Sequence, residues 1–303
     1  MTGPAPRPGS HQGGRSIKAD IDATAPPANA IALWYLGQSG FVVKAGQTIL
    51  YLDPYLSNFL ETYTTGRLDH DPRRFIPPLR PEEIDNADLV FGSHWHYDHI
   101  DPLTMKTAAE RSAGARLIVP RCARQSLVEI GIPAGRFADV ETDVETTVET
   151  RVGAISFTAI PSAHETLERD PVCGYPYWGY VITINGVTLY HSGDCVPYDG
   201  LLERLTRKKV DIAMLPINGR DYFRLARGFA GNFTYREAGD LADAMGADLL
   251  VPMHVGMHMA NTERPGALSD YLADRYPYQR CHFMTPGEKL LYLKEAGEGA
   301  LAF

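Results

Sequence analysis

The sequence predicts an α/β protein in which β-sheets are layered against helices rather than arranged as a single parallel sheet. Two observations predict this fold class. Short strands come first as hairpins and then alternate with helices, and the pattern recurs along the 303 residues. The composition, with 44% hydrophobic and 22% charged residues, excludes disordered, collagen-like and coiled-coil classes. We expect a single domain at residues 29–303, after a disordered tail at residues 1–28 that is rich in proline and glycine.

The first half begins with β-type segments that are separated by turn-forming residues. Strands are expected at 31–36, 41–44, 48–52, 88–92 and 116–119. Asp101 and Pro102 form a helix start, an N-cap acid followed by proline, so a helix is expected at 101–112. A second helix is expected at 121–130. Residues 54–81 contain five prolines and are expected to form a long loop, which in a compact domain is usually functional or disordered.

The second half repeats the alternation. Strands are expected at 154–160, 177–190, 211–215, 249–253, 282–284 and 290–293, and helices at 201–207, 234–245 and 264–275. Asn185 and Gly186 predict a hairpin turn inside the second of these strand segments. Thr234 and Glu237 form a capping box that opens a helix. Residues 217–233 form a second long loop.

Charge and cysteine content limit the partners and the compartment. The net charge of −8 argues against a nucleic-acid surface, and no apolar run approaches the roughly 18 residues that span a bilayer. The expected partner is a small molecule, with no nucleic acid and no membrane. The four cysteines (Cys122, Cys173, Cys195 and Cys281) form no CxxC pair, and we interpret them as buried apolar residues of a cytoplasmic protein.

One segment carries most of the chemistry. Residues 93–99 contain His94, His96, Asp98 and His99 directly after a predicted strand. Imidazole and carboxylate ligands suit divalent transition metals, and so many polar groups would be costly to bury without a partner. Residues two apart in an extended stretch point the same way, which favours a shared metal. The segment therefore predicts a metal site at a strand end.

Three further candidate ligands follow predicted strands downstream: His164, Asp194 and His254. Each alone is a weak signal. In order after the first cluster, they indicate one site built at several strand ends.

The motif HxHxDH, followed by His, Asp and His at successive strand ends, resembles the metallo-β-lactamase superfamily. The resemblance covers roughly residues 30–294. It implies an αββα sandwich, in which two mixed β-sheets are flanked by helices, with one or two divalent metals. It further implies that His94, His96 and His164 hold one metal, that Asp98, His99 and His254 hold a second, and that Asp194 bridges them.

Within the superfamily, the chain is similar to the L-ascorbate-6-phosphate lactonase-like branch. The similarity lies in residues 34–41, 53–57, 189–194 and 211–215, and in residues 251–254 after the helix that begins at Thr234. It implies a homo-oligomer that uses manganese to open a sugar-derived lactone. The residue types also accommodate zinc or iron.

The expected reaction is attack by a metal-bound hydroxide on a carboxylic ester, most simply a lactone with a phosphate or other anionic group. Asp98 is the expected catalytic residue, orienting the hydroxide and passing a proton to the leaving oxygen. Asp53 and His191 are expected to contact the ligands from behind. Candidate substrate contacts are Tyr55, Asn218, Arg220 and His258, of which Arg220 is the candidate for the anionic group.

Two alternatives stay open. A metal-dependent phosphodiesterase on the same fold would use the same ligands. A non-hydrolytic protein, such as a redox di-iron domain or a sensor, is disfavoured because redox members generally carry Glu where this chain has His96.

Overall fold

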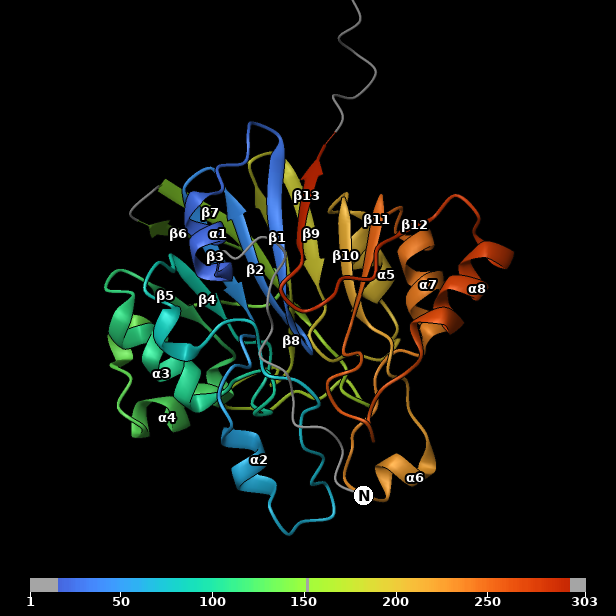
Figure 1. Ribbon diagram of the computed structural model, residues 1–303, viewed down its shortest axis with the longest axis horizontal. Helices are drawn as coiled ribbons and strands as arrows, with labels where there is room; N and C mark the ends of the chain where they lie inside the picture. The colour runs from blue at the N-terminus through green and yellow to red at the C-terminus, as the bar shows by residue number, and fades with distance from the viewer. Residues whose placement is uncertain (1–15, 151–152, 295–303) are drawn as a thin grey trace, which may run out of the picture.

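The computed structural model describes residues 16–150 and 153–294, which form two packed β-sheets with helices on their outer faces (Figure 1). The first sheet has the strand order β13-β1-β2-β3-β4-β5, and the second has the order β12-β11-β10-β9-β8-β7-β6. Both sheets mix parallel and antiparallel pairs. The predicted αββα sandwich is therefore confirmed.

The first sheet uses the amino-terminal strands and the last strand. Its strands are β1 (Ala30–Gly37), β2 (Gly40–Ala45), β3 (Thr48–Leu52), β4 (Leu89–Phe91), β5 (Arg116–Ile118) and β13 (Lys289–Leu293). The helices before and between them are α1 (Ile17–Ala23), α2 (Phe59–Thr64), α3 (Pro102–Arg111) and α4 (Arg121–Glu129), with 3-10 turns at Pro81–Glu83 and Ala134–Arg136. The strands β3, β4 and β5 run parallel, so their carboxyl ends meet at one edge.

The second sheet contains β6 (Glu145–Thr150), β7 (Gly153–Pro161), β8 (Trp178–Ile184), β9 (Val187–His191), β10 (Ile212–Pro216), β11 (Leu249–Met253) and β12 (Arg280–Cys281). Its helices are α5 (Leu201–Thr206), α6 (Tyr222–Leu225), α7 (Tyr235–Ala244) and α8 (Pro265–Arg275). The strands β9 to β12 are parallel, and β7 points the same way because two antiparallel pairings separate it from β9. The loops that leave β7, β9 and β11 therefore emerge together.

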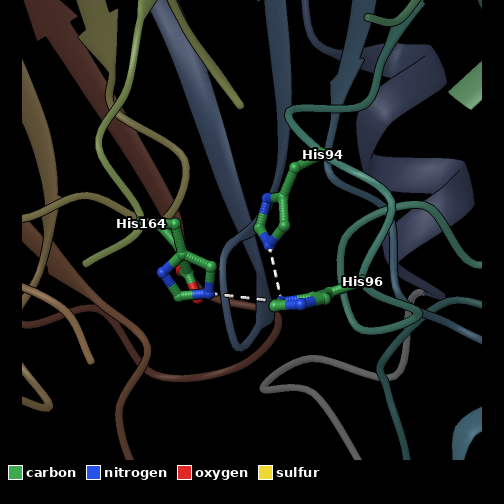
Figure 2. Close-up of side chains that lie close together, drawn as sticks. His94, His96 and His164 are labelled. Atoms are coloured by element: carbon green, nitrogen blue, oxygen red, sulfur yellow. Dashed lines mark hydrogen bonds and ion pairs between the residues drawn. The ribbon is translucent and has the colours of Figure 1, made fainter. Parts of the chain in front are cut away.

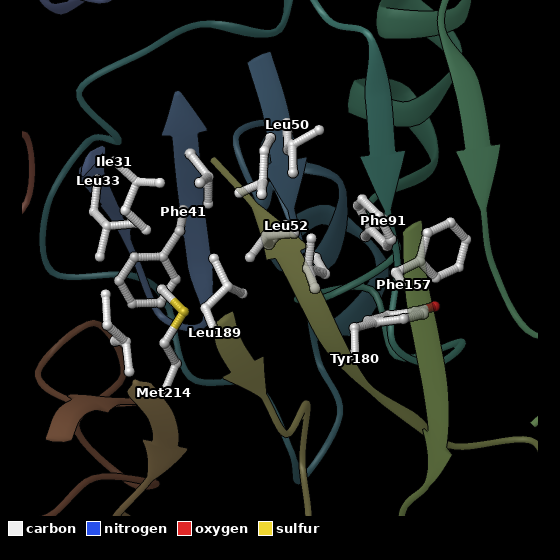
Figure 3. Close-up of a cluster of buried hydrophobic side chains, with 14 of the residues drawn as sticks. Ile31, Leu33, Phe41, Leu50, Leu52, Phe91, Phe157, Tyr180, Leu189 and Met214 are labelled. Atoms are coloured by element: carbon white, nitrogen blue, oxygen red, sulfur yellow. The ribbon is translucent and has the colours of Figure 1, made fainter. Parts of the chain in front are cut away.

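Three apolar clusters correspond to the three interfaces between the four layers. The central cluster lies between the sheets and includes Phe41, Leu189 and Met214 (Figure 3). A second packs α1, α3 and α4 on the first sheet, and a third packs α5, α7 and α8 on the second. Burial on both faces explains why β1 is buried along its whole length.

Local signals for turns and helix ends are confirmed. The Asp101 side chain accepts from the backbone N–H groups of Leu103 and Thr104. The Thr234 and Glu237 capping box is present at the start of α7. Asn185 and Gly186 form the turn between β8 and β9, both with positive φ.

The expected tail is wrong for the part of it that the structure describes. Helix α1 lies within residues 1–28, and its Ile17 and Ile21 side chains are buried against the first sheet. Trp34 Nε1 donates to Asp20 at 2.8 Å, and Lys44 Nζ donates to the carbonyl of Ile21 at 2.7 Å. The segment is too short for its apolar spacing to show as a periodic pattern. Residues 1–15 lie outside the described residues.

The structure differs from the sequence prediction in three smaller features. Strand β6 was not predicted, because its pattern is mostly polar and exposed. Strand β12 lies at residues 280–281 rather than at 282–284. The two long loops each contain a short helix, α2 and α6, and these lie at the same end of the molecule (Figure 1).

The cysteine interpretation is wrong for one pair. Cys122 on α4 and Cys173 in the loop between β7 and β8 form a disulfide, whereas Cys195 and Cys281 are free. The pair is 51 residues apart, so only the tertiary fold brings the two cysteines together. Cysteine usage therefore no longer supports a reducing compartment.

The helices within residues 16–150 and 153–294 are short or amphipathic. None of them combines the length and the apolar character needed to cross a bilayer.

Replacing Ile21 with alanine tests whether α1 belongs to the domain. Because Ile21 is fully buried, we expect Ile21→Ala to lower the free energy of unfolding by about 2–5 kcal/mol, measured by urea denaturation. The control Leu202→Ala, at a side chain that is 39% exposed, should cost less than about 1 kcal/mol. Equal stabilities of Ile21→Ala and the unmodified chain would show that α1 is dispensable.

Candidate metal centre

All seven predicted ligands lie in loops that leave the carboxyl ends of strands. His94, His96, Asp98 and His99 follow β4, while His164, Asp194 and His254 follow β7, β9 and β11. The parallel directions of these strands bring the loops to one edge of the sandwich. The ligands form two groups, which are His94, His96, His164 and Asp194 in the first and Asp98, His99 and His254 in the second.

In the first group, three imidazoles point toward a common centre (Figure 2). His96 Nδ1 lies 3.0 Å from His94 Nε2 and 3.3 Å from His164 Nε2. Asp194 Oδ2 is 3.8 Å from His164 Nε2. Three nitrogens and one carboxylate oxygen, with all ligand atoms within 4.8 Å of one another, form a suitable donor set for a divalent transition metal.

The second group is next to the first and shares Asp194 with it. Asp98 Oδ2 lies 3.6 Å from His254 Nε2 and 3.7 Å from His99 Nε2. Asp194 Oδ1 is 3.2 Å from His99 Nε2, and its Oδ2 is 3.5 Å from His254 Nε2. Asp194 therefore reaches both groups, as a bridging carboxylate must.

The hydrogen bonding of these ligands fits a metal. His99 Nε2 and Asp194 Oδ1 are buried and lie 3.2 Å apart, but neither makes a hydrogen bond of suitable geometry within the described part of the chain. An unpaired donor or acceptor in such a place is costly, and a cation between them would satisfy both groups.

Electrostatics supports the same conclusion. Burial lowers the pKa of His94 well below its usual value, and it lowers the pKa of His96 to about 3. These imidazoles are therefore neutral and offer lone pairs. Although burial opposes it, the facing His99 and His254 hold the pKa of Asp194 well below its usual range. Ionised carboxylates and neutral imidazoles are the forms that bind metal. Although burial opposes it, the facing carboxylates raise the pKa of His99 well above its usual value and that of His254 to about 9, so metal binding to the second group would displace protons from these two imidazoles.

Asp53, expected behind the ligands, contacts the second group directly and the first group through Ser93. Its Oδ2 accepts from His99 Nδ1 at 2.6 Å and from Ser93 Oγ at 2.6 Å, and its Oδ1 accepts from the Ser93 N–H at 2.7 Å. Since the Ser93 hydroxyl donates to Asp53, its oxygen is left to accept from His94 Nδ1 at 2.9 Å. Asp53 thus fixes the tautomers of His99 and His94, so that each directs a free Nε2 at its group.

Two other contacts near the ligands involve the backbone. His164 Nδ1 donates to the carbonyl of Gly231 at 3.2 Å, which leaves its Nε2 for the first group. His191 contacts no ligand side chain through its hydrogen bonds within the described residues. Its Nε2 donates to the carbonyl of Ser39, and its Nδ1 accepts from the N–H of Gly193. His191 therefore positions the backbone immediately before Asp194.

A cavity of about 280 Å³ opens on the ligands. Both long loops line it, through Tyr63, Arg67, Asp69 and Asp71 of the first and residues 228–230 of the second. Arg67, which is paired with Asp69 at 3.0 Å, is the one Lys or Arg among the described residues that line this cavity.

The candidate substrate contacts separate into one that lines the cavity and three that do not. His258 is among the lining residues, whereas Tyr55, Asn218 and Arg220 are not. Arg220 instead makes a bidentate ion pair with Glu237 at the start of α7. Its two terminal guanidinium nitrogens donate to the two carboxylate oxygens at 2.7 and 2.6 Å.

Tyr55 and Asn218 are buried. Asn218 donates to Asn261 Oδ1 at 2.9 Å and accepts from Asn232, so it ties loops together. The Tyr55 ring packs against the Arg73 guanidinium, 4.2 Å from its centroid, and stacks with the His258 ring, 6.0 Å away. It therefore supports the wall of the cavity from behind.

Sequence reasoning missed Gln38. Its Nε2 lies 2.8 Å from Asp98 Oδ2 and 2.9 Å from His254 Nε2, within the second group. Residues 37–40 lie between two predicted strands and within the segment 34–41 that resembles the lactonase-like branch, and neither feature assigns a role to the Gln38 side chain. The signal that could have found it is a long amide side chain in a turn at the same edge of the first sheet as Asp53.

Replacing Asp53 with asparagine tests how the ligands are held. The amide would lack the charge that orients Ser93 and His99, so we expect Asp53→Asn to weaken metal binding in both groups by about 10–100-fold. The measurement is titration of Mn²⁺ or Zn²⁺ into metal-free protein, with the exposed Asp139→Asn as the control. Unchanged affinity in Asp53→Asn would show that the tautomers are fixed by other means.

Comparisons with known proteins agree with this geometry. A model of the beta-lactamase superfamily domain matches residues 48–255. A UPF0173 metal-dependent hydrolase from Thermococcus kodakarensis is 25% identical over 258 residues, covering 84% of this chain and 97% of the relative.

Two solved structures share the fold. An isothiocyanate hydrolase from Delia radicum gut bacteria has a TM-score of 0.67 at 14% identity, covering 86% of this chain and 98% of its own. YhfI of Bacillus subtilis, a metallo-β-lactamase fold protein, has a TM-score of 0.60 at 17% identity, covering 87% and 100%. The family model, the sandwich and the two ligand groups together establish that the chain belongs to the metallo-β-lactamase superfamily, among the metal-dependent hydrolases of this fold.

Proposed function

We propose that this protein uses a divalent metal centre to hydrolyse a carboxylic ester, with a lactone that bears an anionic group as the favoured substrate. The observation that carries the proposal is the pair of ligand groups joined by Asp194 at the floor of a cavity. Manganese and zinc are the favoured metals, with iron as a third option. We further predict that the protein belongs to the lactonase-like branch, forms a homo-oligomer and is located in the cytoplasm.

Cys195 is disfavoured as a nucleophile. Cys195 follows Asp194 directly, but it is fully buried, and burial raises the pKa of its thiol to about 12. Its Sγ donates to the carbonyl of Val196. Cys195 is therefore a packed neighbour of the bridging ligand, and the reaction does not depend on a cysteine thiolate.

When bound, a divalent metal polarises the substrate carbonyl and makes a water acidic enough to react at neutral pH. Asp98 is the proposed acid–base group, because it lines the cavity and lies at the second ligand group. Although burial opposes it, His99 and His254 hold the pKa of Asp98 well below its usual range. Its carboxylate is thus ionised, which is the form that can accept a proton from the attacking water and pass it to the leaving alkoxide.

His258 is the proposed polar contact on the cavity wall. Its Nδ1 donates to the carbonyl of Asp71 at 2.6 Å, so the neutral ring presents an Nε2 lone pair. This Nε2 is buried and has no partner among the residues that the structure describes. A substrate hydroxyl that donates to it would remove the cost of leaving this acceptor unpaired.

The proposed contact for the anionic group of the substrate is Arg67 rather than Arg220. The Arg220 guanidinium is engaged by Glu237 outside the cavity, whereas Arg67 lies on the cavity wall beside the Tyr63 ring, 5.0 Å from its centroid. The Arg67 side chain is 51% exposed, so an incoming carboxylate or phosphate can reach it.

A phosphodiesterase is the second candidate. The specific observation in its favour is the shared carboxylate of Asp194, because two metals held close together suit in-line displacement at phosphorus. Ester and phosphodiester chemistry would use the same ligands.

Metal analysis combined with a substrate panel distinguishes the candidates. We expect protein purified without added metal to contain one to two equivalents of Mn or Zn per chain and to hydrolyse members of a lactone panel. Turnover of bis(p-nitrophenyl) phosphate alone would support the phosphodiesterase. Absence of metal binding, even after reconstitution, would overturn both candidates.

The role of Asp98 predicts a loss of turnover without loss of the fold. On whichever substrate is turned over, we expect Asp98→Asn to lower kcat by about 10²–10⁴-fold, because amide nitrogen and oxygen do not accept the proton. Steady-state kinetics should be compared at matched metal content, determined by elemental analysis. Normal kcat in Asp98→Asn would remove this residue from the proton transfer.

Arg67 and Arg220 form a matched pair of variants. We expect Arg67→Ala to raise KM for an anionic lactone about tenfold, with little change for a neutral lactone, because a charge-assisted hydrogen bond is lost. Arg220→Ala should leave both KM values unchanged. Equal effects of the two variants, or equal effects of Arg67→Ala on both lactones, would contradict the assignment of the anionic group to Arg67.

A further inference from the structure

Gln38 lies where the second ligand group converges, although amides are not among the residue types that the HxHxDH pattern supplies. Its Nε2 is 2.8 Å from Asp98 Oδ2 and 2.9 Å from His254 Nε2. The residue is 1% exposed, so solvent does not compete for the amide. Its neighbours are therefore the ligands themselves.

The backbone holds this side chain in place. Gln38 has a positive φ of 54°, and its carbonyl accepts from the N–H of His254 at 2.7 Å and from the hydroxyl of Tyr35 at 2.9 Å. His254, in turn, has a positive φ of 60°. Two strained turns are thus joined directly, and the amide of one is fixed beside the imidazole of the other.

An amide can present either of two atoms at the same place. Without a cation, the Asp98 carboxylate attracts the Nε2–H group. With a cation between Asp98 and His254, rotation of the amide by 180° directs the oxygen at it instead, because amide nitrogen donates hydrogen bonds and does not accept them. The separations of 2.8 and 2.9 Å are typical of neighbouring atoms around one small ion.

We propose that Gln38 contributes its amide oxygen to the second metal site, beside Asp98, His99, His254 and the shared Asp194. This inference rests on the metal centre of the proposed function and adds a ligand to it. A neutral oxygen donor there, against three imidazoles in the first group, makes the second site richer in oxygen than the first. Oxygen-rich sets favour Mn²⁺ over Zn²⁺, so the two sites should differ in metal preference.

The test is the affinity of each site, measured on the full chain without substrate. Mn²⁺ is titrated into metal-free protein and followed by calorimetry and by electron paramagnetic resonance. We expect two Mn²⁺ binding events in the unmodified chain. Gln38→Ala should weaken one of them, binding at the second ligand group, by about 10–100-fold and leave the other unchanged. Gln38→Glu, which retains an oxygen at the same reach, should restore second-site binding.

The control is Gln125→Ala, because the Gln125 side chain is exposed on α4 and donates to Glu129 of the same helix. One unchanged Mn²⁺ binding event in Gln38→Ala also shows that the variant is folded. Second-site affinity that is unchanged in Gln38→Ala would overturn the proposal. Tighter second-site binding would overturn it too, since the amide would then compete with the metal. Absence of Mn²⁺ binding in the unmodified chain would instead contradict the metal centre itself.

Discussion

The buried carboxylate of Asp53 is the interaction on which the arrangement of both ligand groups depends. It accepts from His99 directly and orients His94 through the hydroxyl of Ser93. A single anion therefore determines which nitrogen His94 presents to the first group and which nitrogen His99 presents to the second. It has this reach because β3 and β4 are parallel neighbours, so the residue that ends one strand lies beside the loop that leaves the other.

The second sheet contributes the rest of the centre by the same geometry. Three loops leave β7, β9 and β11 in a common direction, and each supplies one ligand. None of these loops could hold a metal alone. The sandwich brings them against the loop after β4, where the backbone N–H of Trp178 donates to the carbonyl of Ser93 at 2.9 Å and joins the two sheets at the site. The hydrogen bond that joins the two sheets therefore also holds together the loops that carry the candidate ligands.

The candidate ligands could be recognised in the sequence because strand ends and metal-binding residue types are both local signals. His164, Asp194 and His254 each follow an apolar run, and the structure brings all three to one place. The expected role of Asp53 agrees with its contacts, since an acid at a strand end is equally visible.

What could not be predicted depends on side-chain partners that are distant in sequence. Arg220 appeared available for substrate, but Glu237, which also caps α7, engages it. Gln38 appeared to be a turn residue, because nothing local shows that its amide meets His254 across 216 positions. Helix α1 could not be predicted because its two buried residues form too short a pattern to show a helical period.

The disulfide between Cys122 and Cys173 connects a helix that covers the first sheet to the loop that carries His164. Closing a loop with a sequence separation of 51 residues reduces the entropy of the unfolded chain, by about 4 kcal/mol in free energy at 25 °C in the chain-entropy model. The linked segment includes β7, so the disulfide limits the distance between the two halves of the sandwich when the chain unfolds. Refolding from the oxidised state would thus begin with the His164 loop already tethered to the half that carries the HxHxDH motif.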